Sequence, residues 1–148
     1  MICFISNLKP FSIQAAGCQK YKERLIAEFE PYKLKYPQIP IEDNIYSKII
    51  YIHQKKIDID VDNMSKPFVD AFKGIIYKDD NIINHRVCSK IWLKDFQSYE
   101  IDIFKLPDEI AEKFSNLIEE GAEHIVYYEI GEFSQSMIKI GADWNGTG

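Results

Sequence analysis

Aspartates dominate the part of the sequence that could carry chemistry. Asp60 and Asp62 stand two residues apart in the run IDIDVD, and Asp79 and Asp80 follow as an adjacent pair. Magnesium prefers carboxylate and water oxygens as ligands, and two such cations can activate a water and stabilise charge on a phosphate during phosphodiester hydrolysis. We therefore expect these four carboxylates to converge on a Mg²⁺ site.

A lysine lies between the two aspartate pairs. Clustering like charges costs free energy unless a cation offsets it, so Lys66 is either a partial counter-ion or a donor to the charge that develops on the phosphate. Asp58 and Asp70 are weaker candidates. We expect Asp58 to be exposed to solvent, and Asp70 to cap or to pair locally with Lys66, four residues before it.

The elements that must position these aspartates are two strands and a short helix. In IDIDVD, apolar residues alternate with aspartates, which predicts a strand over residues 45–61 with its carboxylates on one face. A helix is predicted over residues 63–74, and residues 75–93 have the pattern of a hairpin with its turn at Asp79, Asp80 and Asn81. This arrangement would bring all four carboxylates to one edge of a sheet.

Further elements are predicted on both sides of this region. Tyr21, Leu25 and Phe29 recur at a spacing of four, which indicates a helix over residues 15–32. A second helix is predicted over residues 108–120. Further strands are predicted over residues 94–106, 124–130 and 136–140. The fold class is therefore α/β (α+β): a single domain over residues 1–148, with a mixed or antiparallel central sheet flanked by helices.

Composition excludes several other classes of protein. The 148 residues are 46% apolar and 28% charged, as in ordinary globular domains. A net charge of −5 argues against a protein that coats nucleic acid by charge alone, and the three cysteines lack the spacing of a zinc site. No stretch has the length of a membrane span or the pattern of a leader, so we expect a cytoplasmic protein that does not contact membranes.

The spacing of these residues resembles the core of the RusA-type Holliday-junction resolvases, which are small dimeric endonucleases. The resembling residues are Asp60, Asp62, Asn63, Lys66, Asp70, Asp79, Asp80 and Lys90, which lies ten residues after the aspartate pair. The resemblance extends over residues 45–93, is weaker over the first helix and is faint after residue 94. Residues 107–148 are therefore expected to be a divergent part of a RusA-like domain.

The resemblance implies a function and a set of residue roles. Asp60, Asp62 and Asp80 would be the catalytic metal-binding carboxylates, Asp79 would support the metal site, and Lys66 would assist catalysis. The cofactor would be Mg²⁺, with Mn²⁺ as a substitute. The substrate would be a four-way DNA junction in recombination and repair, cut by a homodimer whose two-fold symmetry matches that of the junction.

Three points stay open at this level. The chain could instead be a nuclease for other branched DNA or for RNA, or a catalytically inactive junction-binding or interaction module on the same scaffold. The most basic stretch could contact the DNA backbone or be ordinary solvated helix surface. That stretch contains Lys20, Lys22, Arg24, Lys33 and Lys35.

Overall fold

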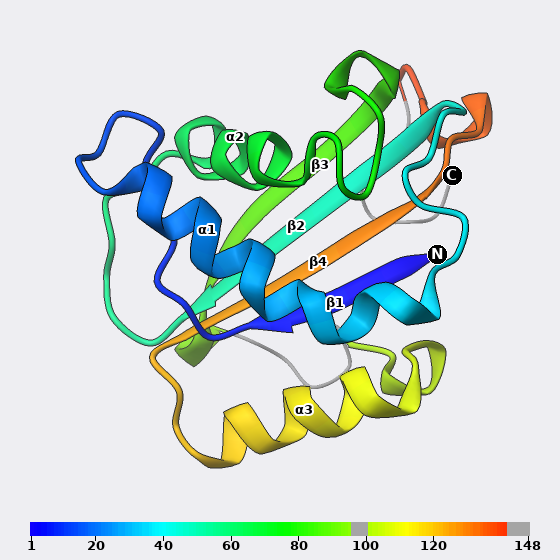
Figure 1. Cartoon of the computed structure of the whole chain (residues 1–148). Helices are drawn as coiled ribbons and strands as arrows, with labels where there is room; N and C mark the ends of the chain where they lie inside the picture. Colours follow the sequence, from blue (N-terminus) through cyan, green and yellow to red (C-terminus); the bar gives the residue numbers. More distant parts are fainter. Residues whose placement is uncertain (96–100, 142–148) are drawn as a thin grey trace.

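A mixed sheet of four strands organises residues 1–95 and 101–141, the part of the chain that the computed structural model describes (Figure 1). The strands are β1 (Ile2–Ser6), β2 (Ile45–His53), β3 (Ile83–Trp92) and β4 (His124–Glu132), in the order β1-β4-β2-β3. β4 is antiparallel to β1 and β2, whereas β2 and β3 are parallel. The predicted mixed sheet with flanking helices is confirmed.

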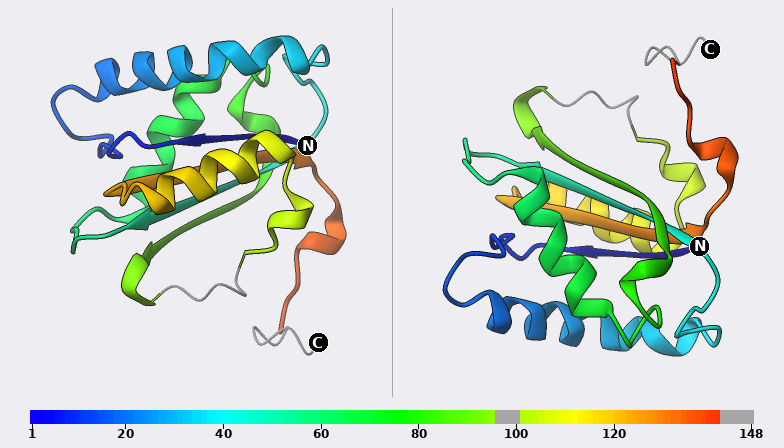
Figure 2. Two further views of the ribbon diagram at one scale, coloured as in Figure 1. Left: turned by 90° about the horizontal axis from the view of Figure 1, so that it is seen from below. Right: turned by 90° about the horizontal axis from the view of Figure 1, so that it is seen from above.

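The described residues form three α-helices, α1 (Cys18–Phe29), α2 (Val61–Phe72) and α3 (Asp108–Glu119). α1 and α2 lie side by side, and α3 lies apart from them (Figures 1 and 2). Alternate residues of β1 point to opposite faces of the sheet: Phe4 packs in the core under α1 and α2, and Ile5 in the core under α3. The sheet therefore has a helical layer on each face.

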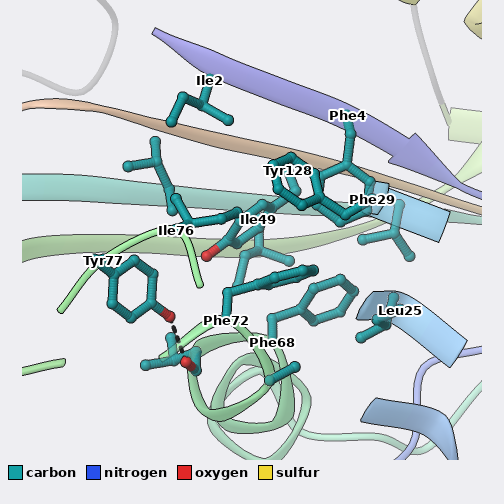
Figure 3. Packing of buried hydrophobic residues seen from close by; sticks show 14 of the residues in the cluster. Ile2, Phe4, Leu25, Phe29, Ile49, Phe68, Phe72, Ile76, Tyr77 and Tyr128 are labelled. Atoms are coloured by element: carbon teal, nitrogen blue, oxygen red, sulfur yellow. Dashed lines mark hydrogen bonds between the residues drawn. The ribbon is translucent and has the colours of Figure 1, made fainter. Parts of the chain in front are cut away.

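The larger core holds α2 against the sheet (Figure 3). The ring of Phe4 packs against the rings of Phe29, Phe72 and Tyr128, with centroids 5.4 to 5.6 Å apart, and all four side chains are fully buried. Burying a side chain of this size contributes about 1.5–3 kcal/mol, and the inclined rings add to it. This packing fixes the helix that carries part of the candidate site.

Three predicted helices and one predicted strand are confirmed with slightly different ends. α2 begins at Val61 and ends at Phe72, where a helix was predicted over residues 63–74. α1 begins at Cys18 and ends at Phe29, after which a 3-10 helix continues over Glu30–Lys35. Tyr21, Leu25 and Phe29, which recur every four residues along α1, are buried, as expected for an amphipathic helix. α3 and β4 fall where residues 108–120 and 124–130 predicted them.

The predicted strand over IDIDVD is wrong beyond His53. β2 ends there because β3 ends at its partner Trp92 and β4 begins at its other partner, His124, so no strand remains for later residues to pair with. The chain instead runs as a loop to Val61, where α2 begins, and the Met64 N–H donates to the Asp60 carbonyl at 2.9 Å. The alternation arises because the isoleucines of this loop rest on the core while its aspartates are exposed.

The predicted hairpin over residues 75–93 is also wrong, because β3 pairs in parallel with β2 and α2 forms the crossover between them. Gly74 turns the chain with φ +81°, and its N–H donates to the Tyr77 carbonyl at 2.7 Å. Tyr77 is fully buried, and its hydroxyl donates to the Val69 carbonyl (dashed in Figure 3). This side chain anchors the segment under α2 instead of leaving it at the sheet edge.

The remaining differences concern short segments. β1 was not predicted, because its five consecutive buried residues show no alternation. Residues 136–140 form no strand: a 3-10 turn over Gln135–Met137 starts at Ser134, whose hydroxyl accepts from the Ser136 N–H. Residues 94–95 and 101–106 are also not strand, and residues 96–100 lie outside the described part. No helix in the described residues is long and apolar enough to cross a membrane.

Candidate active site

Asp60 and Asp62 lie at the start of α2. Asp60 is the N-cap residue and Asp62 lies in the first turn. Both are exposed, and within the described residues neither carboxylate makes a hydrogen bond or a salt bridge. The positive end of a helix dipole favours negative charge at this position, so the fold accepts two carboxylates that have no protein partner.

β3 holds the loop that leads to these aspartates. Three of its side chains, two residues apart, point toward the loop and donate to its carbonyls: Lys90 to Ile59 at 2.8 Å, Cys88 to Val61 at 3.4 Å, and Trp92 to Gln54 at 3.0 Å. Burial raises the pKa of the Cys88 thiol to about 11, so it stays protonated and can donate. Lys90, the last residue of the motif, thus fixes the backbone next to Asp60.

A proline inside α2 connects its first turn to the N-terminal loop. Pro67 has no N–H, so the Asn63 carbonyl four residues earlier cannot form its helical hydrogen bond. The Ile13 N–H donates to that carbonyl at 3.1 Å instead. The loop of residues 7–17 is thereby attached beside Asp60.

Asp60 and Asp62 face two different hollows. The first, which we call the Asp60 groove, has a volume of about 540 Å³ and lies between the N-terminal loop and the loop before α2. Asp58 lines it with Asp60, and Asp58 is exposed as expected. The second, the Asp62 hollow, has a volume of about 350 Å³ and is lined by Asp62, Lys66 and Arg86, among others.

Two cations stand near the carboxylate in the Asp62 hollow. Lys66 lies four residues after Asp62 on the same helix, and its ammonium pairs with Asp70 at 3.1 Å, as expected from the sequence. Arg86 of β3 donates to the Ser65 hydroxyl at 3.4 Å. The sequence analysis did not identify Arg86, although it alternates with Cys88 on the strand that follows the aspartate pair.

Asp79 and Asp80 lie beyond the other end of α2, where Lys73 pairs with them. The Lys73 ammonium is 3.1 Å from Asp79 and 3.7 Å from Asp80. The Asp79 carboxylate also accepts from the Asp80 backbone N–H at 2.8 Å. Hydrogen bonding to Asp80, followed by that to Lys73, holds the pKa of Asp79 below its ordinary range.

The four predicted aspartates therefore do not converge within one chain. Asp60 and Asp62 follow the end of β2, whereas Asp79 and Asp80 precede the start of β3. Because β2 and β3 are parallel, these two positions lie at opposite ends of the strands. Between the two pairs runs α2, whose twelve residues make a helix about 18 Å long at 1.5 Å rise per residue. The described residues contain no group of three or more His, Cys, Asp or Glu that could hold a metal ion.

One chain alone thus does not fit a four-carboxylate metal site. Magnesium in nucleic-acid enzymes is commonly bound by one or two carboxylates, with waters and substrate phosphates completing its shell. Asp60 and Asp62, exposed at one helix start, match that smaller requirement. Asp79 and Asp80 could join such a site only from a second copy of the chain.

Comparison with known proteins identifies the region that carries these residues. A family model described as the endodeoxyribonuclease RusA matches residues 13–103, which is more than half of the chain. The match includes α1, β2, α2 and β3, and with them both aspartate pairs, Lys66 and Lys90. It thus begins before α1, further toward the N-terminus than the best part of the motif resemblance. A search of curated proteins found no match.

Proposed function

The chain belongs to the RusA endodeoxyribonuclease family, and from that premise we propose that it is a Mg²⁺-dependent endonuclease that cuts four-way DNA junctions as a homodimer. The family itself implies DNA endonuclease activity. The observation that carries the rest is the pair of exposed carboxylates at the start of α2, held in place by β3 and without a protein partner in the described residues.

Asp60 and Asp62 would hold the metal ion. When bound, Mg²⁺ supplies an activated water and stabilises charge on the phosphate oxygens. Lys66 and Arg86 line the hollow next to Asp62, where they can attract and orient the phosphate. Asp70 keeps the Lys66 ammonium on this face of the helix. Lys90 positions Asp60 through the Ile59 carbonyl.

A second copy of the chain would supply the missing carboxylates. In a dimer with two-fold symmetry the contacts are reciprocal, and a helix that crosses the axis packs antiparallel to its counterpart. Such an axis beside α2 would bring Asp79 and Asp80 of the second copy toward Asp60 and Asp62 of the first. It would create two equivalent sites, which suits paired cuts in a junction that is itself approximately two-fold symmetric.

A cleavage assay tests the proposed reaction. We expect wild-type protein to cut a four-way junction faster than a flap, a linear duplex or RNA, in Mg²⁺ but not with a chelator. Asp60→Asn should lose cleavage while keeping junction binding. Lys33→Gln, an exposed change distant from the aspartates, should cut as wild type does. Binding without cleavage in either Mg²⁺ or Mn²⁺ would contradict the proposal.

Mixing two inactive variants tests whether two copies share the site. Suppose that Asp62→Asn and Asp80→Asn are each inactive. In a mixed dimer with shared sites, one site carries both substitutions and the other carries neither, so mixing should restore cleavage of one strand. If each site belongs to a single chain, every site stays defective and no activity returns. Activity should be measured on a junction with a different label on each strand.

A further inference from the structure

A third hollow, which we call the Arg24 hollow, shares Phe11 with the Asp60 groove. Phe11 and Lys9 line both, so the two hollows adjoin along the N-terminal loop. Lys56 contributes to the Asp60 groove, and Lys20 and Arg24 of α1 to the Arg24 hollow. Figure 1 shows the loop before α1 next to the segment that enters α2. We call these four cations, Lys9, Lys20, Arg24 and Lys56, the basic track.

The basic track differs from Lys33 and Lys35 of the same stretch in how its charges are used. All four of its cations are exposed, and within the described residues none of them forms a salt bridge. Lys33, by contrast, pairs with Glu30 at 3.9 Å, and Lys35 pairs with Glu109 of α3. The chain as a whole carries a net charge of −5, so a group of cations without partners at this place is a local exception.

The N-terminal loop, which carries Lys9 of the basic track, is held against both α1 and α2. The ring of Phe11 stacks on Tyr21 of α1, with centroids 5.4 Å apart and planes inclined by 14°. Gly17, just before α1, supplies the positive φ of +89° that ends the loop. The hydrogen bond from Ile13 to Asn63 ties the same loop to α2. The cations are therefore presented on a preformed surface that ends at Asp60.

We infer that the basic track binds the phosphates of the DNA strand that leads into the candidate active site. This inference rests on the proposed function for its ligand. Exposed cations along two adjoining hollows suit a polyanion, because each phosphate contact releases condensed counterions from the DNA. The track would place one strand at Asp60 and compensate locally for a chain that is acidic overall. It also divides the basic stretch, because Lys20 and Arg24 belong to the track whereas Lys33 and Lys35 do not.

Salt-dependent binding tests the track. Affinity for a labelled four-way junction should be measured by fluorescence anisotropy over a range of KCl concentrations, with a chelator present so that no cleavage occurs. The test variant is Lys20→Gln with Arg24→Gln, and the matched control is Lys33→Gln with Lys35→Gln. Each lost phosphate contact lowers the slope of log affinity against log salt by about 0.9 for duplex DNA. We expect the test variant to lose about 1.8 in slope, and the control to match wild type.

The outcomes separate this inference from the proposed function. Equal salt slopes for the test variant and wild type would overturn the inference that the track binds phosphates. Equal losses of slope in the test variant and its control would also overturn it. If wild type binds with the expected slopes but never cuts DNA, the track stands and the proposed reaction fails. If wild type cuts junctions while the test variant keeps its slope, only the track fails. No binding by wild type at any salt concentration would overturn both.

Discussion

The two aspartate pairs stand at opposite ends of α2 and meet different surroundings. At its start, Asp60 and Asp62 are exposed and have no protein partner in the described residues, while β3 fixes only the backbone beside them. Beyond its end, Lys73 pairs with both Asp79 and Asp80. The carboxylates of the first pair are thus held in place without a partner in the described residues, whereas those of the second pair form salt bridges with Lys73.

The electrostatics of a helix account for part of this difference. The N-terminus carries partial positive charge and favours carboxylates, so the first pair is stable there without a lysine. The C-terminus carries partial negative charge, which makes a nearby aspartate pair unfavourable unless a cation offsets it. Lys73 is that cation, and the aspartates in turn raise its pKa through the hydrogen bond to Asp79. A metal ion would meet no competing lysine contact at the first pair.

The largest effect should come from removing a carboxylate at the start of α2. We expect Asp62→Asn to lower junction cleavage by more than about a hundredfold, because changes to groups that only support metal ligands already cost 10–100-fold. Asp79→Asn, at the other end, should lower it by about tenfold or less, since Asp79 is committed to Lys73. Single-turnover rates measure both. Equal losses in the two variants would remove the distinction between the pairs.

The next effect concerns the backbone support of the first pair. Lys90→Met removes the donor to the Ile59 carbonyl, and we expect cleavage to fall about 10–100-fold, as for other groups that orient metal ligands. Junction affinity in a chelator should stay the same, and Lys90→Arg should recover part of the rate. Lys78→Met serves as control, because within the described residues Lys78 pairs only with exposed Glu42. A loss of thermal stability large enough to explain the lower rate would contradict a positioning role.

A third effect concerns the stability of the other end of α2. Tyr77 is fully buried and its hydroxyl donates to the Val69 carbonyl. Tyr77→Phe leaves that acceptor without this donor, which should lower the free energy of unfolding by about 1–3 kcal/mol. Urea unfolding followed by circular dichroism measures it. Tyr32→Phe, at a half-buried tyrosine of the 3-10 helix after α1, is the control and should change stability little.

The same comparison shows how far the sequence alone could lead. Spacing identified both aspartate pairs, the Lys66–Asp70 pair and the helices, because these depend on residues close together in the chain. The prediction that the two aspartate pairs lie together relied on a hairpin over residues 75–93. β3 instead pairs in parallel with β2, and Tyr77 of the segment between α2 and β3 is buried; both involve contacts with distant parts of the chain, which no local pattern reveals.

The alternation in IDIDVD illustrates a second limit. Period two predicts a strand only where a neighbouring strand can pair, and here the sheet ends at His53. The isoleucines then pack on the core from a loop, with the same alternation. Arg86 was missed for a related reason. It lies on β3 and contacts Ser65 of α2, which is 21 residues earlier in the sequence.

The smallest effect is a titration that probes the second pair directly. The ordinary pKa of an aspartate is 3.8, and in the folded chain that of Asp79 lies below it. Asp79 therefore stabilises the fold at pH values above 3.8 and loses this contribution as the pH falls through its lower folded pKa. Lys73→Met should move the pKa of Asp79 back up, although hydrogen bonding to Asp80, through its side chain and then its backbone N–H, should keep it from rising fully. NMR titration of the side-chain carboxyl carbons measures the shift. An unchanged pKa in this variant would show that Lys73 does not hold the pair, and that the two ends of α2 differ less than their contacts indicate.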